Sequence, residues 1–292
     1  MARVRFRIRS CRGFSLIELL VVIAIIALLV AILIPSLGKA RQAAKATREV
    51  VSAQQIMVAT LLYSNDSKGA VIPGYAPQWM VNGPVVVRDN QGERLTDEIA
   101  MRYPWRIYPY MGESFRGLYE QEKVLADLLE KEATYASAGI NYEYAVSLFP
   151  SLGINASFFG GNDRRLQFEN DYDARTGRVV LRRIEDAIRP SEVLTFVSAR
   201  SAPMNPLPIQ GQPQGFFRVE PPIFDASRGR VWGAAYDARA NPAANSGYVS
   251  LRHGGKAVGA HVDGHARLLG WTDLGDMRRW SDAATFEAWG VR

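Results

Sequence analysis

The feature that most constrains this chain is an apolar run close to its N-terminus. From Phe14 to Ile34 the only polar members are Ser15 and Glu18. A helix rises by about 1.5 Å per residue, so a run of this length spans the roughly 30 Å hydrocarbon layer of a membrane. An ordinary secretory signal has a shorter apolar part of about 7–15 residues. The sequence therefore predicts a transmembrane helix.

Basic residues precede this run and predict its orientation. The first 13 residues hold five of the 35 lysines and arginines and no acid. Such a segment stays in the cytoplasm, so everything after residue 38 should lie on the other side of the membrane. The rest of the chain carries 30 basic against 29 acidic residues. The excess of basic over acidic residues thus comes from the targeting segment. The expected partner is therefore membrane lipid and not nucleic acid.

A motif marks the start of the apolar run. Arg12-Gly13-Phe14-Ser15-Leu16-Ile17-Glu18-Leu19-Leu20 follows the basic segment. It closely resembles the processing site of type IV prepilins and type II secretion pseudopilins, and the resemblance covers about the first 50 residues. It implies that a prepilin peptidase and methyltransferase cuts after Gly13 and methylates the new N-terminal Phe14. The only cysteine, Cys11, would leave with the leader, so the mature chain would have no disulfide, thiol nucleophile or thiolate metal site.

Glu18 and Pro35 also match this family, at the fifth and twenty-second positions of the expected mature chain. A carboxylate within a membrane span is costly, so Glu18 either reaches toward the interface or neutralises the Phe14 amine of a neighbouring subunit. Proline lacks an N–H group, so Pro35 either ends the membrane helix or kinks a helix that continues. The resemblance implies the second interpretation at both positions.

The residues after Pro35 favour a continuing amphipathic helix that ends at Asn65-Asp66-Ser67-Lys68-Gly69. Apolar and small residues recur at helical spacing and are expected to pack against a sheet: Leu37, Ala40, Ala44, Thr47, Val51, Val58, Leu61 and Leu62. The other face is expected to be polar, with Arg41, Gln42, Lys45, Arg48 and Glu49.

The chain is therefore expected to comprise a cleaved leader at 1–13, a transmembrane helix at 14–35, its amphipathic continuation at 36–64 and a head at 65–292. The fold class is α+β and pilin-like, with the long N-terminal helix packed on an antiparallel sheet. Strand-like runs occur at Val85–Arg88, Val193–Val197, Phe216–Val219, Tyr248–Leu251, Lys256–Val262 and Ala266–Leu269.

Other segments of the head carry weaker signals. A second helix is expected at Leu118–Tyr135, and loops are expected at Pro150–Asp163 and Ser201–Gln214. The aromatic cluster Tyr103–Tyr110 is expected to pack in the core, the alternative being a sticky or carbohydrate-stacking surface.

The three histidines lie close together near the C-terminus. His253, nine further residues and Asp263-Gly264 resemble the C-terminal motif of prepilin-like proteins from planctomycete-type bacteria. Gly254-Gly255 and Asp263-Gly264 are turn dipeptides, so the motif predicts a three-stranded meander with a hydrogen bond from His253 to the Asp263 turn. The alternatives are catalytic acid–base work and a metal site. Zinc ligands would come from His253, His261, Asp263 and His265.

Taken together, these patterns predict a structural subunit of a type II secretion or type IV pilus-like filament, with pilin-like subunits as partners. It would cross the bacterial inner membrane once, with its head periplasmic or extracellular. The sequence contains none of the common hydrolase, metalloprotease or phosphate-binding motifs, so we expect no enzyme and no cofactor. The alternative is a membrane-anchored enzyme, or a metal-binding or adhesive module, that uses residues 253–265. A calcium site at Asn162-Asp163 or Asn170–Asp173 would need added backbone ligands.

Overall fold

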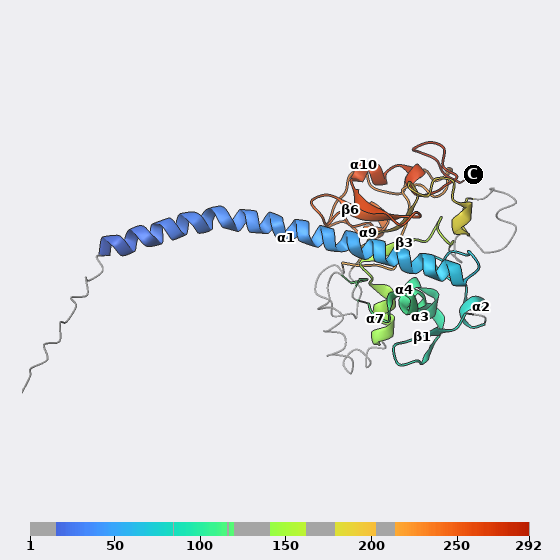
Figure 1. Ribbon diagram of the computed structural model, residues 1–292. Coiled ribbons are helices and arrows are strands. Elements are labelled where there is room, and N and C mark those ends of the chain that lie inside the picture. Colours follow the sequence, from blue (N-terminus) through green and yellow to red (C-terminus); the bar gives the residue numbers. More distant parts are fainter. Residues whose placement is uncertain are drawn as a thin grey trace, which may run out of the picture. The chain divides into compact units, whose positions relative to one another are not determined.

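The computed structural model describes residues 16–83, 85–115, 117–119, 141–161, 179–202 and 214–291 (Figure 1). The chain divides into two compact units, Met1–Ala44 and Lys45–Arg292, and each is described by itself. Most of the expected Leu118–Tyr135 helix and of the expected Ser201–Gln214 loop lies outside the described residues. Both calcium candidates, Asn162-Asp163 and Asn170–Asp173, lie wholly outside them.

One helix, α1 (Leu16–Asp66), runs through both units and contains Pro35. The helix continues past the proline, as the sequence predicts, and the hydroxyl of Ser36 donates to the carbonyl of Leu33 at 2.8 Å. At its C-terminal end, the amide of Gly69 donates to the carbonyl of Ser64 at 2.7 Å. Gly69 has a φ of +85°, which glycine adopts without strain, so it stops the helix where expected.

The face of α1 that packs into the head is not the predicted one. Val51, Val58 and Leu62 are 45%, 55% and 49% exposed. The buried positions lie on the opposite side: Ala46, Glu49, Ala53, Ile56, Met57, Ala59, Thr60 and Ser64. Most of these side chains are small, so the backbone of the helix can approach its neighbours closely. Thr60 satisfies its hydroxyl within the helix by donating to the Ile56 carbonyl. The predicted stripe was therefore wrong, because residue size and polar pairing select the buried face.

The second unit contains a five-stranded sheet of order β5-β3-β4-β6-β7. Its strands are β3 (Leu152–Asn155), β4 (Leu194–Ser198), β5 (Arg218–Val219), β6 (Ala257–His261) and β7 (Ala266–Leu269). Neighbours are antiparallel except β3 and β5. A separate hairpin pairs β1 (Val87–Arg88) with β2 (Arg94–Leu95). These elements confirm an α+β, pilin-like fold with a long N-terminal helix.

Two strand predictions were wrong. The segment Pro150–Asp163 was expected to be a loop but contains β3. Glycine is a weak strand residue, but position 153 requires it because a Cβ there would lie 2.7 Å from the Arg218 backbone. The expected Tyr248–Leu251 strand makes only an isolated bridge, from Val249 to Ala199. The predicted meander is therefore a two-stranded hairpin of β6 and β7.

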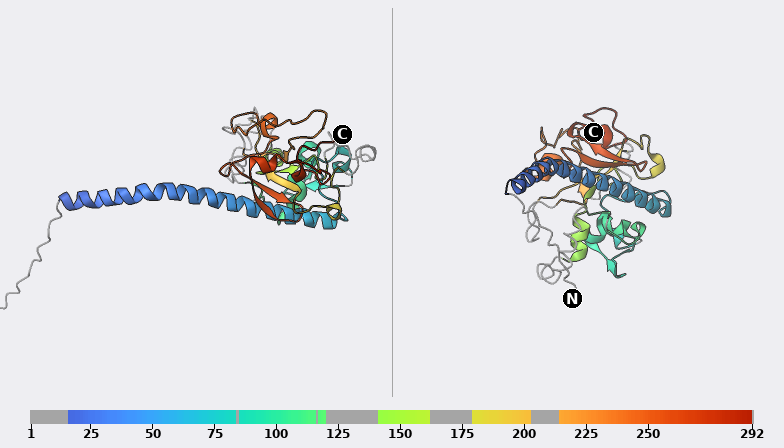
Figure 2. Two further views of the ribbon diagram at one scale, coloured as in Figure 1. Left: turned by 90° about the horizontal axis from the view of Figure 1, so that it is seen from above. Right: turned by 60° about the vertical axis from the view of Figure 1, so that its left-hand side comes forward.

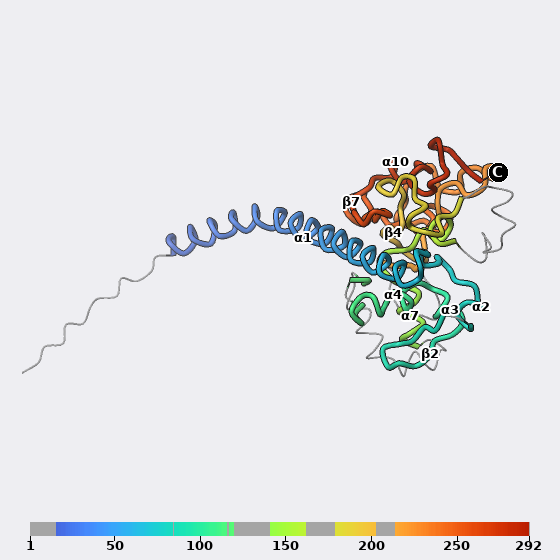
Figure 3. The backbone as a smooth tube through the Cα atoms, turned by 45° about the vertical axis from the view of Figure 1, so that its right-hand side comes forward, coloured from blue at the N-terminus to red at the C-terminus, as the bar shows by residue number. Residues whose placement is uncertain are grey.

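Short helices complete the second unit. Figure 3 and the right-hand view of Figure 2 show the part of α1 in this unit, residues 45–66, lying between the C-terminal strands and the group α3, α4 and α7. The bounds are α2 (Gln78–Val81), α3 (Asp97–Met101), α4 (Tyr103–Ile107), η1 (Tyr108–Met111), α7 (Tyr142–Leu148), η2 (Ile184–Asp186), α9 (Pro242–Ser246), α10 (Trp271–Leu274) and η3 (Met277–Arg279).

The aromatic cluster at α4 and η1 packs in the core, as predicted. Tyr103 and Trp105 are fully buried, and the Trp105 ring meets Phe115 edge-on at 4.8 Å between centroids. The Tyr103 hydroxyl donates to the Leu152 carbonyl at 2.5 Å, which links α4 to β3. This cluster is therefore not a carbohydrate-stacking surface.

Candidate functional site

The predicted processing and assembly residues fall at the start of α1. Gly13 and Phe14 lie outside the described residues, whereas Glu18 lies in the first turn of α1 and Pro35 within it. Every residue from Leu16 to Pro35 is exposed to solvent in the isolated chain. α1 is the one described helix that is long and apolar enough to cross a membrane. An exposed apolar segment of this length would be insoluble in water, so a membrane or a protein partner must cover it.

A second candidate site is a buried ionic cluster where α1 meets the head. Glu49 of α1 is 3% exposed. The Arg252 guanidinium binds its carboxylate with two nitrogens, Nη2 to Oε1 at 2.9 Å and Nε to Oε2 at 3.0 Å. His253 Nε2 lies 2.5 Å from Oε2, and the Ser198 hydroxyl donates to Oε1 at 2.6 Å. The cluster therefore ties α1 to β4 and to the loop before β6.

The same contacts keep Glu49 ionised. Burial alone would raise its pKa, but the charge of Arg252 and the hydrogen bonds from His253, Arg252 and Ser198 outweigh it. The net effect lowers the pKa of Glu49 to about 2. Arg252 also donates to the carbonyls of Ala199 and Ser151, so one guanidinium joins the helix, the sheet and the loop before β3.

This cluster corrects the prediction for His253. The hydrogen bond was expected to reach the Asp263 turn, but the His253 ring pairs with Glu49, 204 positions earlier in the chain. The backbone of His253 pairs with Lys256 around the Gly254-Gly255 turn, so the ring is held at the start of the β6–β7 hairpin and not at its tip. Glu49 itself was assigned to the polar outer face of the helix. The signal that sequence reasoning missed was the carboxylate of Glu49 on the helix together with the basic dipeptide Arg252-His253, which can pair with it.

The other two histidines lie at the tip of the β6–β7 hairpin. His261 is fully buried, and its ring stacks on that of His265 with centroids 4.2 Å apart and 5° between the planes. His265 Nδ1 lies 2.6 Å from Asp263 Oδ1, and its backbone amide donates to the same oxygen at 3.1 Å. Gly264 between them has a φ of +93°, so the turn requires glycine. Asp263 and Gly264 thus shape this turn without His253.

The zinc hypothesis gains no support from this geometry. The described residues hold no group of three or more His, Cys, Asp or Glu side chains placed to share a metal ion. His253 is engaged at Glu49, whereas His261, Asp263 and His265 lie together at the other end of β6. A parallel ring stack also keeps the two imidazole lone pairs from converging on one ion.

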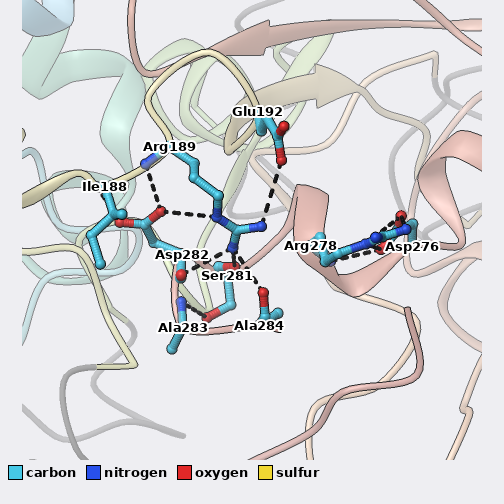
Figure 4. A network of polar contacts seen from close by, with 9 residues as sticks. All are labelled: Ile188, Arg189, Glu192, Asp276, Arg278, Ser281, Asp282, Ala283 and Ala284. Carbon is cyan, nitrogen blue, oxygen red and sulfur yellow. Dashed lines mark hydrogen bonds and ion pairs between the residues drawn. The ribbon is translucent and has the colours of Figure 1, made fainter. Parts of the chain in front are cut away.

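A further polar network fixes the segment beside this hairpin tip (Figure 4). The Asp282 carboxylate accepts from the backbone amides of Ile188 and Arg189 at 2.5 and 2.9 Å. The Arg189 guanidinium in turn donates to the carbonyls of Ser281, Asp282 and Ala284. Because Asp263 donates its amide to the Pro190 carbonyl, the turn, this segment and the C-terminal residues form one connected support.

Burial of His261 should make stability depend on pH. Burial, and then the charges of His265 and Arg267, lower its pKa to about 4 from an ordinary 6.5. Between about pH 6.5 and pH 4 the unfolded chain therefore binds a proton at His261 that the folded chain does not bind. The free energy of unfolding is highest above this window and falls as pH drops through it. A pKa lowered from 6.5 to about 4 makes the folded state about 3 kcal/mol less stable below pH 4 than above pH 6.5.

We expect His261→Phe, which keeps a ring for the stack, to flatten this dependence in a fragment of residues 42–292. Denaturant unfolding across the window measures it. The matched control is His265→Phe, which leaves His261 in place and should retain most of the slope, because burial and not the charge of His265 is the largest cause of the lowered pKa. An unchanged slope in His261→Phe would refute the assignment of the proton to this side chain.

The comparisons with known proteins bear on the N-terminal site. Residues 8–34 match the family model of the prokaryotic N-terminal methylation motif. The chain thus carries a prepilin-type N-terminal segment, and this motif is one of processed structural proteins and not of an enzyme family. Neither the curated proteins nor the solved structures include a match to the chain. The match does not extend to residues 253–265.

Proposed function

We propose that this chain is a structural subunit, of the pseudopilin or minor-pilin kind, in a type II secretion or type IV pilus-like filament. Its prepilin peptidase cuts after Gly13 and methylates Phe14. The mature subunit rests in the bacterial inner membrane as a single-pass protein, with its N-terminus cytoplasmic and its head in the periplasm. It leaves the bilayer by joining a filament of pilin-like subunits.

The observation that carries this proposal is the match of residues 8–34 to the methylation motif, within which the long exposed apolar helix α1 begins. A signal peptide that is removed whole would leave no such helix on the mature chain. Cleavage after Gly13 instead retains the whole apolar run and places a new amine at its start. That end of the helix then needs an anionic partner, and Glu18 of a neighbouring subunit supplies one.

The outer face of α1 in the second unit supports the same proposal. Val51, Val58 and Leu62 are spaced by seven and four residues, so they form one line along the exposed side of the helix. Thr47 and Gln54 flank this line on one side, as Arg48 and Gln55 do on the other. An apolar line with polar borders is the pattern that a partner helix covers in a coiled-coil-like contact.

Mass spectrometry of the native protein tests the proposal directly. The expected mature chain begins at Phe14 and is heavier by one methyl group. An intact Met1 N-terminus, or cleavage beyond the apolar run, would refute it.

We expect Glu18→Leu to leave insertion and cleavage intact but to reduce assembly, because it lengthens the apolar run and removes the partner of the Phe14 amine. The mature chain would contain no cysteine, so a Val58→Cys reporter on the exposed line gives subunit crosslinks in native membranes. A reporter at exposed Glu185 is the matched control for random collisions. Crosslinks at Val58→Cys should fall in Glu18→Leu, and crosslinks at the unmodified level would contradict the charge pairing.

The alternative functions find less support. In the described part of the chain, His253 is engaged by Glu49, and His265 by Asp263 and the His261 ring. These contacts use the histidines to hold the fold together, and the hydroxyl that shares Glu49 with His253, that of Ser198, is fully buried and donates to the Glu49 carboxylate. A catalytic or metal-binding function for residues 253–265 therefore has no geometric argument in its favour.

A further inference from the structure

Two hollows in the head share one wall formed by Arg218 and Tyr248. One has a volume of about 570 Å³ and extends toward Phe224 and Arg228. The other has a volume of about 370 Å³ and extends toward Arg102 and Tyr144. Both volumes lie in the range of about 300–1,000 Å³ that small-molecule sites occupy. Because Arg218 and Tyr248 line both hollows, the two lie next to each other, and together they are called the groove.

The residue with a strained backbone in this shared lining is Tyr248. Tyr248 has a φ of +68°, a left-handed conformation that a bulky residue rarely adopts. Two hydrogen bonds hold its backbone there, from its amide to the Pro242 carbonyl and from the Arg200 amide to its own carbonyl. Its ring stacks on Phe216 with centroids 4.2 Å apart and remains partly exposed. This backbone conformation, at the end of α9, holds an aromatic ring in the groove.

The charged groups of the groove come in opposite-charge pairs. Arg102 binds Glu98 at 2.7 Å, Arg218 lies 3.3 Å from Glu220, and Arg228 lies 3.9 Å from Asp225. Arg218 also lies over the rings of Phe216, Phe217 and Tyr248. Three guanidinium groups therefore balance three carboxylates, and the groove as a whole does not favour an anion or a cation.

A neutral ligand with many hydroxyl groups fits this chemistry. A hydroxyl both donates and accepts, so neighbouring hydroxyls can accept from a guanidinium and donate to the carboxylate beside it. The apolar C–H face of a pyranose ring can pack on an aromatic ring such as that of Tyr248. We infer that this groove binds a neutral oligosaccharide, which goes beyond the proposed function in the filament and does not depend on it.

An extended peptide is less well matched to the same place. β5 is an edge strand of the five-stranded sheet, but the amide of Glu220 just beyond it donates to the Gly247 carbonyl. The chain therefore covers part of the edge to which a peptide strand would add.

Calorimetric titration of the full chain in a zwitterionic, sugar-free detergent tests the inference. The probes are cellotetraose, xylotetraose, tetra-N-acetylchitotetraose and maltotetraose, with tetragalacturonate as an acidic counterpart and a neutral ten-residue peptide as the alternative. At least one neutral tetrasaccharide should bind at millimolar or lower concentration and bind more tightly than tetragalacturonate. Absence of neutral sugar binding, tighter binding of the acid, or binding of the peptide alone would overturn the inference.

Two variants place the binding in the groove. Tyr248→Asn removes the ring, and asparagine tolerates the left-handed backbone, so the fold is relieved of strain. Arg218→Lys keeps the charge but loses the planar fork. Each should weaken sugar binding about tenfold, as loss of a central anchor does. Phe286→Ala, at an aromatic that is 50% exposed and does not line either hollow, is the matched control. Unchanged affinity in both groove variants would overturn the assignment.

Discussion

Glu49→Ala is expected to unfold or severely destabilise the head, with a loss of about 3–5 kcal/mol. The substitution leaves the charge of Arg252, whose side chain is 10% exposed, without its carboxylate. It also removes the partner of His253, which is 5% exposed. Uncompensated buried charge and unpaired polar atoms are among the most costly consequences of a single change. The measurement is the melting temperature and denaturant midpoint of residues 42–292, which include the entire second unit.

Gln54→Ala is the matched control, because it shortens an exposed side chain on the same helix and should change stability by less than about 0.5 kcal/mol. His253→Ala should fall between the two, at about 1–3 kcal/mol, since Arg252 still neutralises Glu49. Melting temperatures of Glu49→Ala and Gln54→Ala within a degree or two of each other would show that the Glu49 cluster does not stabilise the packing of α1 on the head.

Acid should weaken the same cluster. The folded-state pKa of Glu49 is about 2, below its ordinary 4.5, so its contribution is complete above about pH 4.5 and is lost as pH falls toward 2. This window lies below that of His261, which spans about pH 4 to 6.5. The two windows meet near pH 4, so acid titrations of stability in the unmodified protein and in His261→Phe separate the two groups.

The local features of the fold could be predicted from the sequence. The apolar run predicted the helix from its length alone. Lys68-Gly69 predicted where the helix ends, because a glycine there can adopt the left-handed conformation that closes a helix. β6 and β7 were also found, since turn dipeptides bracket them. Each of these signals lies within a few residues of the element that it specifies.

Features that depend on distant residues were missed. The face of α1 was misassigned because Val51 and Val58 are more apolar than Ala46 and Ala53, although the sheet accepts the smaller side chains. β3 was read as a loop because Gly153 is a weak strand residue, and its purpose appears only beside the Arg218 backbone. The Glu49 cluster joins residues more than 200 positions apart. No local pattern specifies such a contact.

Gly13→Val is expected to abolish maturation, whereas Gly13→Ala should be processed for the most part. The peptidase implied by the methylation motif must bind an extended stretch of backbone at the cut, and a β-branched residue there restricts the backbone and crowds the scissile bond. The measurement is the mass of the chain recovered from membranes, in which retention of residues 1–13 marks the block.

Gly38→Val is the matched control for this prediction, because a Cβ at Gly38 would meet nothing within 4 Å. It places the same substitution in α1 beyond the apolar run, where valine costs an exposed helix little. Cleavage of this variant together with failure of Gly13→Val would show that the effect arises at the cut and not from poor insertion. Normal loss of 13 residues from Gly13→Val would show that the cut does not require a small residue at position 13. Loss of any other number of residues from the unmodified chain would place the processing site elsewhere, and the pairing between the Phe14 amine and Glu18 would then lose its basis.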